Sequence, residues 1–114
     1  MPIETDIYYR HLDTEKDGKY SKMTTADLSA GGFRCYTETQ FEEGALLNCM
    51  LIAGYEALPA TAQILSSAPG AEKPLLYDTR AIFYKLNDEI RDRVVKYIFS
   101  KQRQTHSKFY RRKN

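Results

Sequence analysis

The chain has 114 residues, a formal net charge of +2 and two cysteines, a composition that fits one domain able to bury a core without disulfides. No apolar run approaches the length of a membrane-spanning helix, and the first residues show no basic segment followed by an apolar one. We therefore expect a cytoplasmic protein. Cys35 and Cys49 lie within apolar stretches, so we expect buried thiols in preference to a disulfide or a reactive site.

Positive charge is concentrated near the C-terminus. Nine of the 17 Lys and Arg residues lie in residues 91–114, together with a single acidic residue, Asp92. Residues 1–90 therefore carry 8 basic and 14 acidic side chains. The chain thus combines an acidic body with a basic C-terminal segment.

Six short segments have the pattern of β-strands, and turn signals separate them. They are residues 6–12, 20–28, 32–38, 43–54, 58–68 and 75–86. Asp17-Gly18 predicts a hairpin between the first two. The fourth segment is apolar enough to be buried on both faces, and the fifth should turn four residues inward. These four are Leu58, Ala60, Ala62 and Ile64. Such strands suit a small six-stranded antiparallel β-barrel, which has no exposed sheet edge, so the predicted fold class is mainly β.

One helix is predicted after the strands. Asn87 can cap it, and the helix should span residues 88–103 with acidic side chains at its positive end. Four apolar residues at helical spacing should pack on the barrel as a plug or lid. They are Ile90, Val94, Tyr97 and Ile98. We expect one domain over residues 1–104, the barrel with its helix, followed by a basic tail at 105–114 that is partly disordered or binds a partner.

Sequence signals for catalysis are absent. The only histidines, His11 and His106, lie far apart in the sequence without cysteine or carboxylate at ligand spacing, so no metal site is predicted. Ser29 lacks a nucleophile elbow, and the glycines beside it are not followed by the Lys-Ser/Thr of a phosphate-binding loop. We therefore predict that the protein is not an enzyme and needs no cofactor.

The turn between the second and third segments, "TADLSAGGFRC", holds the pattern Asp-x-Ser-x-x-Gly at Asp27, Ser29 and Gly32. Residues i and i+2 of a strand point to the same face, and Gly31-Gly32 permit close approach of backbone N–H groups. Such a group of residues can bind a hydroxyl, a guanine edge or a phosphate. The alternative is a simple Asx or Ser turn whose glycines supply positive φ.

These residues, together with the chain's C-terminal part, resemble the PilZ family, small β-barrel receptors of the bacterial messenger cyclic di-GMP. "TADLSAGGFRC" is similar to that family's Asp/Asn-x-Ser-x-x-Gly segment, and residues 59–103 resemble its last strands and C-terminal helix, as in flagellar-brake-like members. The resemblance spans most of residues 3–104. It implies a receptor that regulates motility, biofilm or exopolysaccharide, with Asp27, Ser29, Gly31 and Gly32 as ligand-binding residues and a protein partner in motility or secretion machinery.

The chain departs from the family in one respect. Members that bind the dinucleotide carry Arg-x-x-x-Arg before the first strand, where planar guanidinium groups bind phosphates and stack on guanines. Residues 1–114 contain no Arg-x-x-x-Arg. Either an upstream segment supplies these arginines, or the natural protein lacks them, and we expect weak or absent binding of cyclic di-GMP by residues 1–114 alone. Tight binding would require Arg10, Arg34 or the tail to take their place.

Three functional hypotheses follow. The first is a cyclic di-GMP effector domain that retains half of the ligand site. The second is a PilZ-like module that binds a protein partner and no nucleotide. The third is a barrel that uses the basic tail and Phe109-Tyr110 against nucleic acid. The intact Asp-x-Ser-x-x-Gly pattern favours the first over the second. The acidic body disfavours the third, because a nucleic-acid groove usually needs basic strands as well as a basic tail.

Overall fold

Six antiparallel strands form a closed barrel, followed by one helix. The computed structural model describes residues 2–12 and 19–113, the last ten of these by their backbone only. The strands are β1 (Asp6–His11), β2 (Ser21–Leu28), β3 (Gly32–Thr37), β4 (Leu46–Ala53), β5 (Glu56–Pro69) and β6 (Tyr77–Phe83), and the helix is α1 (Asp88–Lys113). Each strand lies within or close to its predicted segment, so the predicted mainly-β barrel with a C-terminal helix is confirmed. The predicted Asp17-Gly18 hairpin lies outside the described residues.

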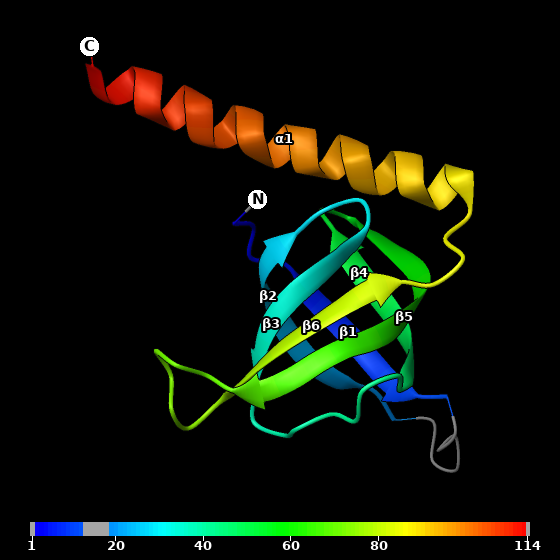
Figure 1. Cartoon of the computed structure of the whole chain (residues 1–114). Coiled ribbons are helices and arrows are strands. Elements are labelled where there is room, and N and C mark those ends of the chain that lie inside the picture. The colour runs from blue at the N-terminus through cyan, green and yellow to red at the C-terminus, as the bar shows by residue number, and fades with distance from the viewer. Residues whose placement is uncertain (1, 13–18, 114) are drawn as a thin grey trace.

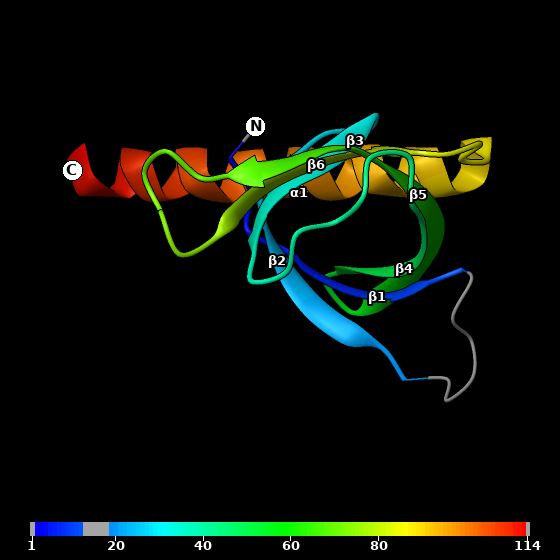
Figure 2. The same cartoon turned by 60° about the horizontal axis from the view of Figure 1, so that its bottom comes forward.

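The barrel closes in the order β1-β2-β3-β6-β5-β4, and β4 pairs with β1 to complete it (Figures 1 and 2). Strands β3 and β6 are neighbours although a long stretch of chain separates them. This crossover brings residues of β6 beside the turn between β2 and β3. Pairing between strands far apart in the sequence therefore brings the walls of the candidate site together.

Apolar residues of alternating strand positions fill the barrel. Fully buried side chains include Ile7 of β1, Leu28 of β2, Leu51 of β4 and Ile64 of β5. In β5 the inward residues are those predicted, with Ala60 half-buried and the other three buried. The expectation for β4 was wrong: its residues alternate between buried and half-buried, because only one face of this strand meets the core.

A β-bulge interrupts β2 next to the predicted site. Thr25 pairs with Cys35 and Asp27 pairs with Arg34, so the strand gains one residue between these two pairs. Thr25 is buried, whereas Asp27 is half-exposed and Leu28 is buried. A regular strand would place Asp27 inside the barrel with Thr25, since residues two apart share a face. The bulge reverses this alternation and turns the carboxylate outward.

Helix α1 lies across one end of the barrel, and its C-terminal part extends beyond the barrel (Figures 1 and 2). Asn87 caps it as predicted, because its Oδ1 accepts a hydrogen bond of 2.8 Å from the backbone N–H of Ile90. The predicted stripe is confirmed: Val94 is fully buried, and the other three residues pack against the core.

The helix is longer than predicted. It continues to Lys113 instead of ending at Arg103, and no proline or glycine between Asp88 and Lys113 would interrupt it. The division into a domain at 1–104 and a tail at 105–114 remains a prediction. Within the described ranges, α1 is not apolar enough to cross a membrane.

Candidate ligand-binding site

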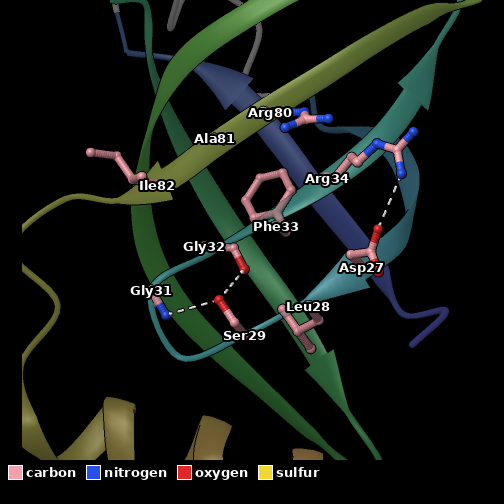
Figure 3. Close-up of a pocket in the computed structure, with 10 residues that line it drawn as sticks. All are labelled: Asp27, Leu28, Ser29, Gly31, Gly32, Phe33, Arg34, Arg80, Ala81 and Ile82. Atoms are coloured by element: carbon pink, nitrogen blue, oxygen red, sulfur yellow. Dashed lines mark hydrogen bonds and ion pairs between the residues drawn. The ribbon is translucent and has the colours of Figure 1, made fainter. Parts of the chain in front are cut away.

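The four predicted ligand-binding residues lie along one open pocket on the outer surface of the barrel (Figure 3). The pocket has a volume of about 480 Å³, which is within the usual size of small-molecule sites. Its walls come from the end of β2, the following turn, the start of β3 and the middle of β6. They consist of Asp27, Leu28, Ser29, Gly31, Gly32, Phe33, Arg34, Arg80, Ala81 and Ile82.

Asp27 meets a positive partner across the strand pair. Its Oδ2 lies 3.3 Å from Nη1 of Arg34, the residue directly opposite it in β3. The Asp27 side chain is 39% exposed to solvent, so it remains accessible from the pocket. The ion pair holds the carboxylate in place at the pocket wall.

Arg34 is bound still more closely by a second acid. Its Nε and Nη2 donate to the two oxygens of Asp78 at 3.0 and 3.1 Å, and Nη2 also donates to Tyr36 Oη at 2.7 Å. Hydrogen bonding to Asp78 raises the pKa of Arg34 above its ordinary value. The same bonds lower the pKa of Asp78. Both groups are therefore charged at neutral pH.

Ser29 closes the turn that precedes β3. Its backbone N–H donates to the carbonyl of Gly32 at 2.9 Å, and its Oγ donates to the same oxygen at 3.3 Å. The Oγ also accepts a hydrogen bond of 3.2 Å from the N–H of Gly31. Ser29 is nevertheless solvent-exposed and lines the pocket, while its hydroxyl points to Gly32 and stabilises the turn.

The two glycines have different roles, and neither supplies positive φ, contrary to the simple-turn interpretation. A Cβ at Gly32 would clash with the carbonyl oxygen of Ala81, so glycine is required for β3 to approach β6. A Cβ at Gly31 would meet only Ser29 Oγ, at 3.8 Å. Gly31 also binds β6, because its carbonyl accepts a 2.9 Å hydrogen bond from Phe83.

Sequence reasoning missed Arg80. It lies on β6, far along the chain from the turn, and only the β3–β6 pairing brings it to the pocket. The sequence indicates Arg34 only as a possible substitute for the absent Arg-x-x-x-Arg. Its place one step after Phe33 in the alternating third segment could have indicated an outward-facing side chain beside the turn. Within the described ranges, no group of three or more potential metal ligands comes together.

The chain before β1 is hydrogen-bonded to Thr25 of β2, two residues before Asp27. The backbone N–H of Thr25 donates to the carbonyl of Thr5 at 2.9 Å, and Thr25 Oγ1 donates to the carbonyl of Ile3 at 2.6 Å. Residues 3–5 therefore run beside the part of β2 that leads into Asp27.

Solved structures of PilZ domains superpose on this barrel. The PilZ domain of CeSA from a cellulose-synthesizing bacterium superposes with a TM-score of 0.66 at 16% identity, over 90% of this chain and 96% of that one. The PilZ domain of Escherichia coli YcgR, solved with c-di-GMP, gives a TM-score of 0.68 at 16% identity, over 92% and 86%. The chain has the PilZ-domain fold.

The PilZ fold also occurs within longer proteins. Bacillus subtilis MotI/DgrA, an inhibitor of motility, superposes with a TM-score of 0.75 at 12% identity over 91% of this chain. This chain spans 49% of that protein's length. A scan against family sequence models and a search of curated proteins give no match. The shared PilZ fold is therefore evident from the structure at sequence identities too low to carry function.

Proposed function

We propose that the chain is a cyclic di-GMP receptor domain that responds to the messenger by binding it at the pocket beside Ser29 and by acting on a protein partner. The observation that carries this proposal is the common location of Asp27, Ser29, Gly31 and Gly32 on one outward-facing pocket. The role is that of a receptor without catalysis, in regulation of motility, biofilm or exopolysaccharide.

The chemistry of the pocket supports a guanine nucleotide. A carboxylate such as Asp27 can accept hydrogen bonds from the N–H donors of a guanine edge, and exposed backbone near Gly31 can approach a flat ring closely. The bulge that turns Asp27 outward is a feature of a kind that recurs next to binding sites. The PilZ domain of YcgR, which has the same fold as this chain, was solved with c-di-GMP, and this similarity of fold also supports the proposal.

The position of residues 3–5 supports a two-part site. Because they run beside Thr25, an arginine-bearing segment joined before Pro2 would reach the pocket from the side of Asp27. Such arginines would bind the phosphates of the dinucleotide. The chain by itself should accordingly bind weakly.

The second candidate is a PilZ-like module that docks on a protein partner and binds no nucleotide. One observation favours it: the hydroxyl of Ser29 already makes hydrogen bonds with Gly31 and Gly32, as a purely structural turn requires. In that case the pocket residues serve the turn and the β3–β6 contact.

A titration followed by two-dimensional NMR decides between the two candidates, since it detects weak binding. We expect cyclic di-GMP to shift the amide signals of Asp27, Ser29, Gly31 and Gly32, and Asp27→Asn to weaken these shifts. Cyclic di-AMP is the matched control ligand, because adenine presents a different edge. Absence of shifts at millimolar ligand, both for this chain and for one with an arginine-bearing segment before Pro2, would favour the interaction module.

A further inference from the structure

Two arginines face the same pocket from neighbouring strands. Arg34 of β3 and Arg80 of β6 are directly paired in the strand register, and both side chains project from the outer face of the barrel (Figure 3). Like charges placed opposite each other on one face repel. Asp78 reduces this repulsion, since it lies 3.0 Å from Arg34 Nε and 3.9 Å from Arg80 Nε.

The hydrogen-bonding capacity of Arg34 is largely used within the protein. A guanidinium group has five N–H donors. Four hydrogen bonds from Arg34 reach Asp78, Asp27 and Tyr36. Arg34 is therefore a positioning residue: it holds the Asp27 carboxylate against the pocket wall.

Arg80 makes weaker contacts within the protein than Arg34. Its side chain is 60% exposed, and its Nε is 3.9 Å from Asp78 Oδ1, which is beyond hydrogen-bond distance. The guanidinium thus keeps its fork of donors for a ligand. Arginine binds phosphate through such a fork, with two parallel N–H···O bonds.

The charges at the pocket leave one cation accessible. Arg34 and Arg80 belong to its wall together with Asp27, and Asp78 lies just outside the wall. These four charges balance, but both aspartates hydrogen-bond to Arg34 and neither hydrogen-bonds to Arg80. Arg80 is therefore the cation of this group that remains accessible to an anion.

We propose that Arg80 binds a phosphate of the dinucleotide from within this chain, while Arg34 positions Asp27 for the guanine. This inference rests on the proposed function and adds to it a phosphate-binding residue on β6. One charge-assisted bidentate contact gives the chain a weak affinity of its own, before any arginines upstream are considered.

The test is the affinity for cyclic di-GMP of four proteins, measured by NMR titration: the unaltered chain, Arg80→Gln, Arg80→Lys and Asp27→Asn. Arg91→Gln is the matched control, because Arg91 is exposed on α1 outside the pocket. We expect Arg80→Gln to weaken binding about tenfold or more and Arg80→Lys to restore part of it, since lysine keeps the charge but loses the fork. Arg80→Gln should also reduce the salt dependence of binding, which a purely structural role would not change.

The outcomes separate this inference from the proposed function. If Asp27→Asn weakens binding while Arg80→Gln behaves like Arg91→Gln, the phosphate role of Arg80 is wrong and the receptor function stands. If residues 1–114 bind too weakly to measure, the same variants are compared with an arginine-bearing segment fused before Pro2. Absence of binding there too would overturn both proposals. Because Arg80 is largely exposed, unchanged melting temperatures will show that its variants are folded.

Discussion

Arg34 and Asp78 form a two-bond ion pair between β3 and β6, from Nε to Oδ1 at 3.0 Å and from Nη2 to Oδ2 at 3.1 Å. The pair ties the strand that carries the candidate site to the strand that crosses over to reach it. Bidentate pairs of this geometry are among the stronger surface interactions. The lowered pKa of Asp78 makes this contribution dependent on pH.

Acid should remove the stabilisation that this ion pair provides. Since the pKa of Asp78 is lower in the folded protein than in the unfolded chain, the pair stabilises the fold above the ordinary aspartate pKa of about 3.9 and loses its effect as pH falls through the folded-state value. We expect urea denaturation to show Asp78→Asn less stable than the unaltered chain at pH 7, with the difference shrinking below about pH 4. Glu43→Gln, at an exposed loop position, is the control. An equal difference at pH 7 and pH 2.5 would contradict this assignment.

The neighbouring glycines should respond differently to the same substitution. Gly32→Ala places a Cβ against the Ala81 carbonyl and should destabilise the fold by about 1–3 kcal/mol, through a shift of β3 away from β6. Gly31→Ala has room and should leave stability nearly unchanged. Thermal unfolding of both variants measures the difference. Equal melting temperatures would mean that β3 and β6 do not approach as closely as described.

Burial of the helix stripe should make Val94 sensitive to charge. Val94 is 1% exposed, so Val94→Asp would place an unpaired carboxylate in the apolar contact between α1 and the barrel. We expect a loss of more than about 3 kcal/mol in the free energy of unfolding. Ser100→Asp, at an exposed position of the same helix, should have little effect in comparison. If Val94→Asp unfolds at the same urea concentration as the unaltered chain, α1 is detached from the barrel in solution.

The two thiols should be unreactive in the folded protein. Both cysteines are free and buried, and burial raises the pKa of each, Cys35 and Cys49, to about 12. At pH 8 we expect a thiol reagent to label neither residue until denaturant unfolds the chain, when both react. A variant with an exposed thiol, Ser100→Cys, is the positive control. Rapid labelling of the unaltered folded chain would show that the barrel opens.

An arginine-bearing segment before Pro2 should strengthen ligand binding. Each hydrogen bond to a charged group contributes roughly 1.5–3 kcal/mol, so one strong contact from each of two arginines should add about 3–6 kcal/mol, on the order of 10²–10⁴-fold in affinity. Calorimetry with cyclic di-GMP compares chains fused to Arg-x-x-x-Arg and to Gln-x-x-x-Gln. Equal affinities of the two fusions would mean that the segment does not reach the pocket.

Local pattern in the sequence was sufficient for the secondary structure and the class of fold. Alternation of apolar and polar residues predicts a strand wherever one face is buried, as in residues 58–64, and the pattern requires no knowledge of partners. Asn87 predicted the start of the helix for a similar reason, since a cap interacts with the backbone three residues away. The end of the helix was missed because the sequence holds no breaking residue there.

Part of the site could also be predicted from the local sequence. Asp27, Ser29 and the two glycines lie within six residues of one another, so the turn itself brings them together. The reason that Gly32 must be glycine could not be predicted locally. A Cβ there would clash with Ala81, which lies 49 positions further along the chain on another strand.

Tertiary structure alone decided which charges share the pocket and which way Asp27 points. Simple alternation from Met23 and Thr25 would bury Asp27, and the bulge that prevents this arises where β2 must pair with β3 and also bury Leu28. Arg80 meets Arg34 because the barrel closes through the β3–β6 pair, and Asp78 joins them by the same register. A sequence pattern can indicate each of these residues separately. Which of them lie close together depends on the order of the strands, and that order is a property of the whole closed sheet and not of any local segment.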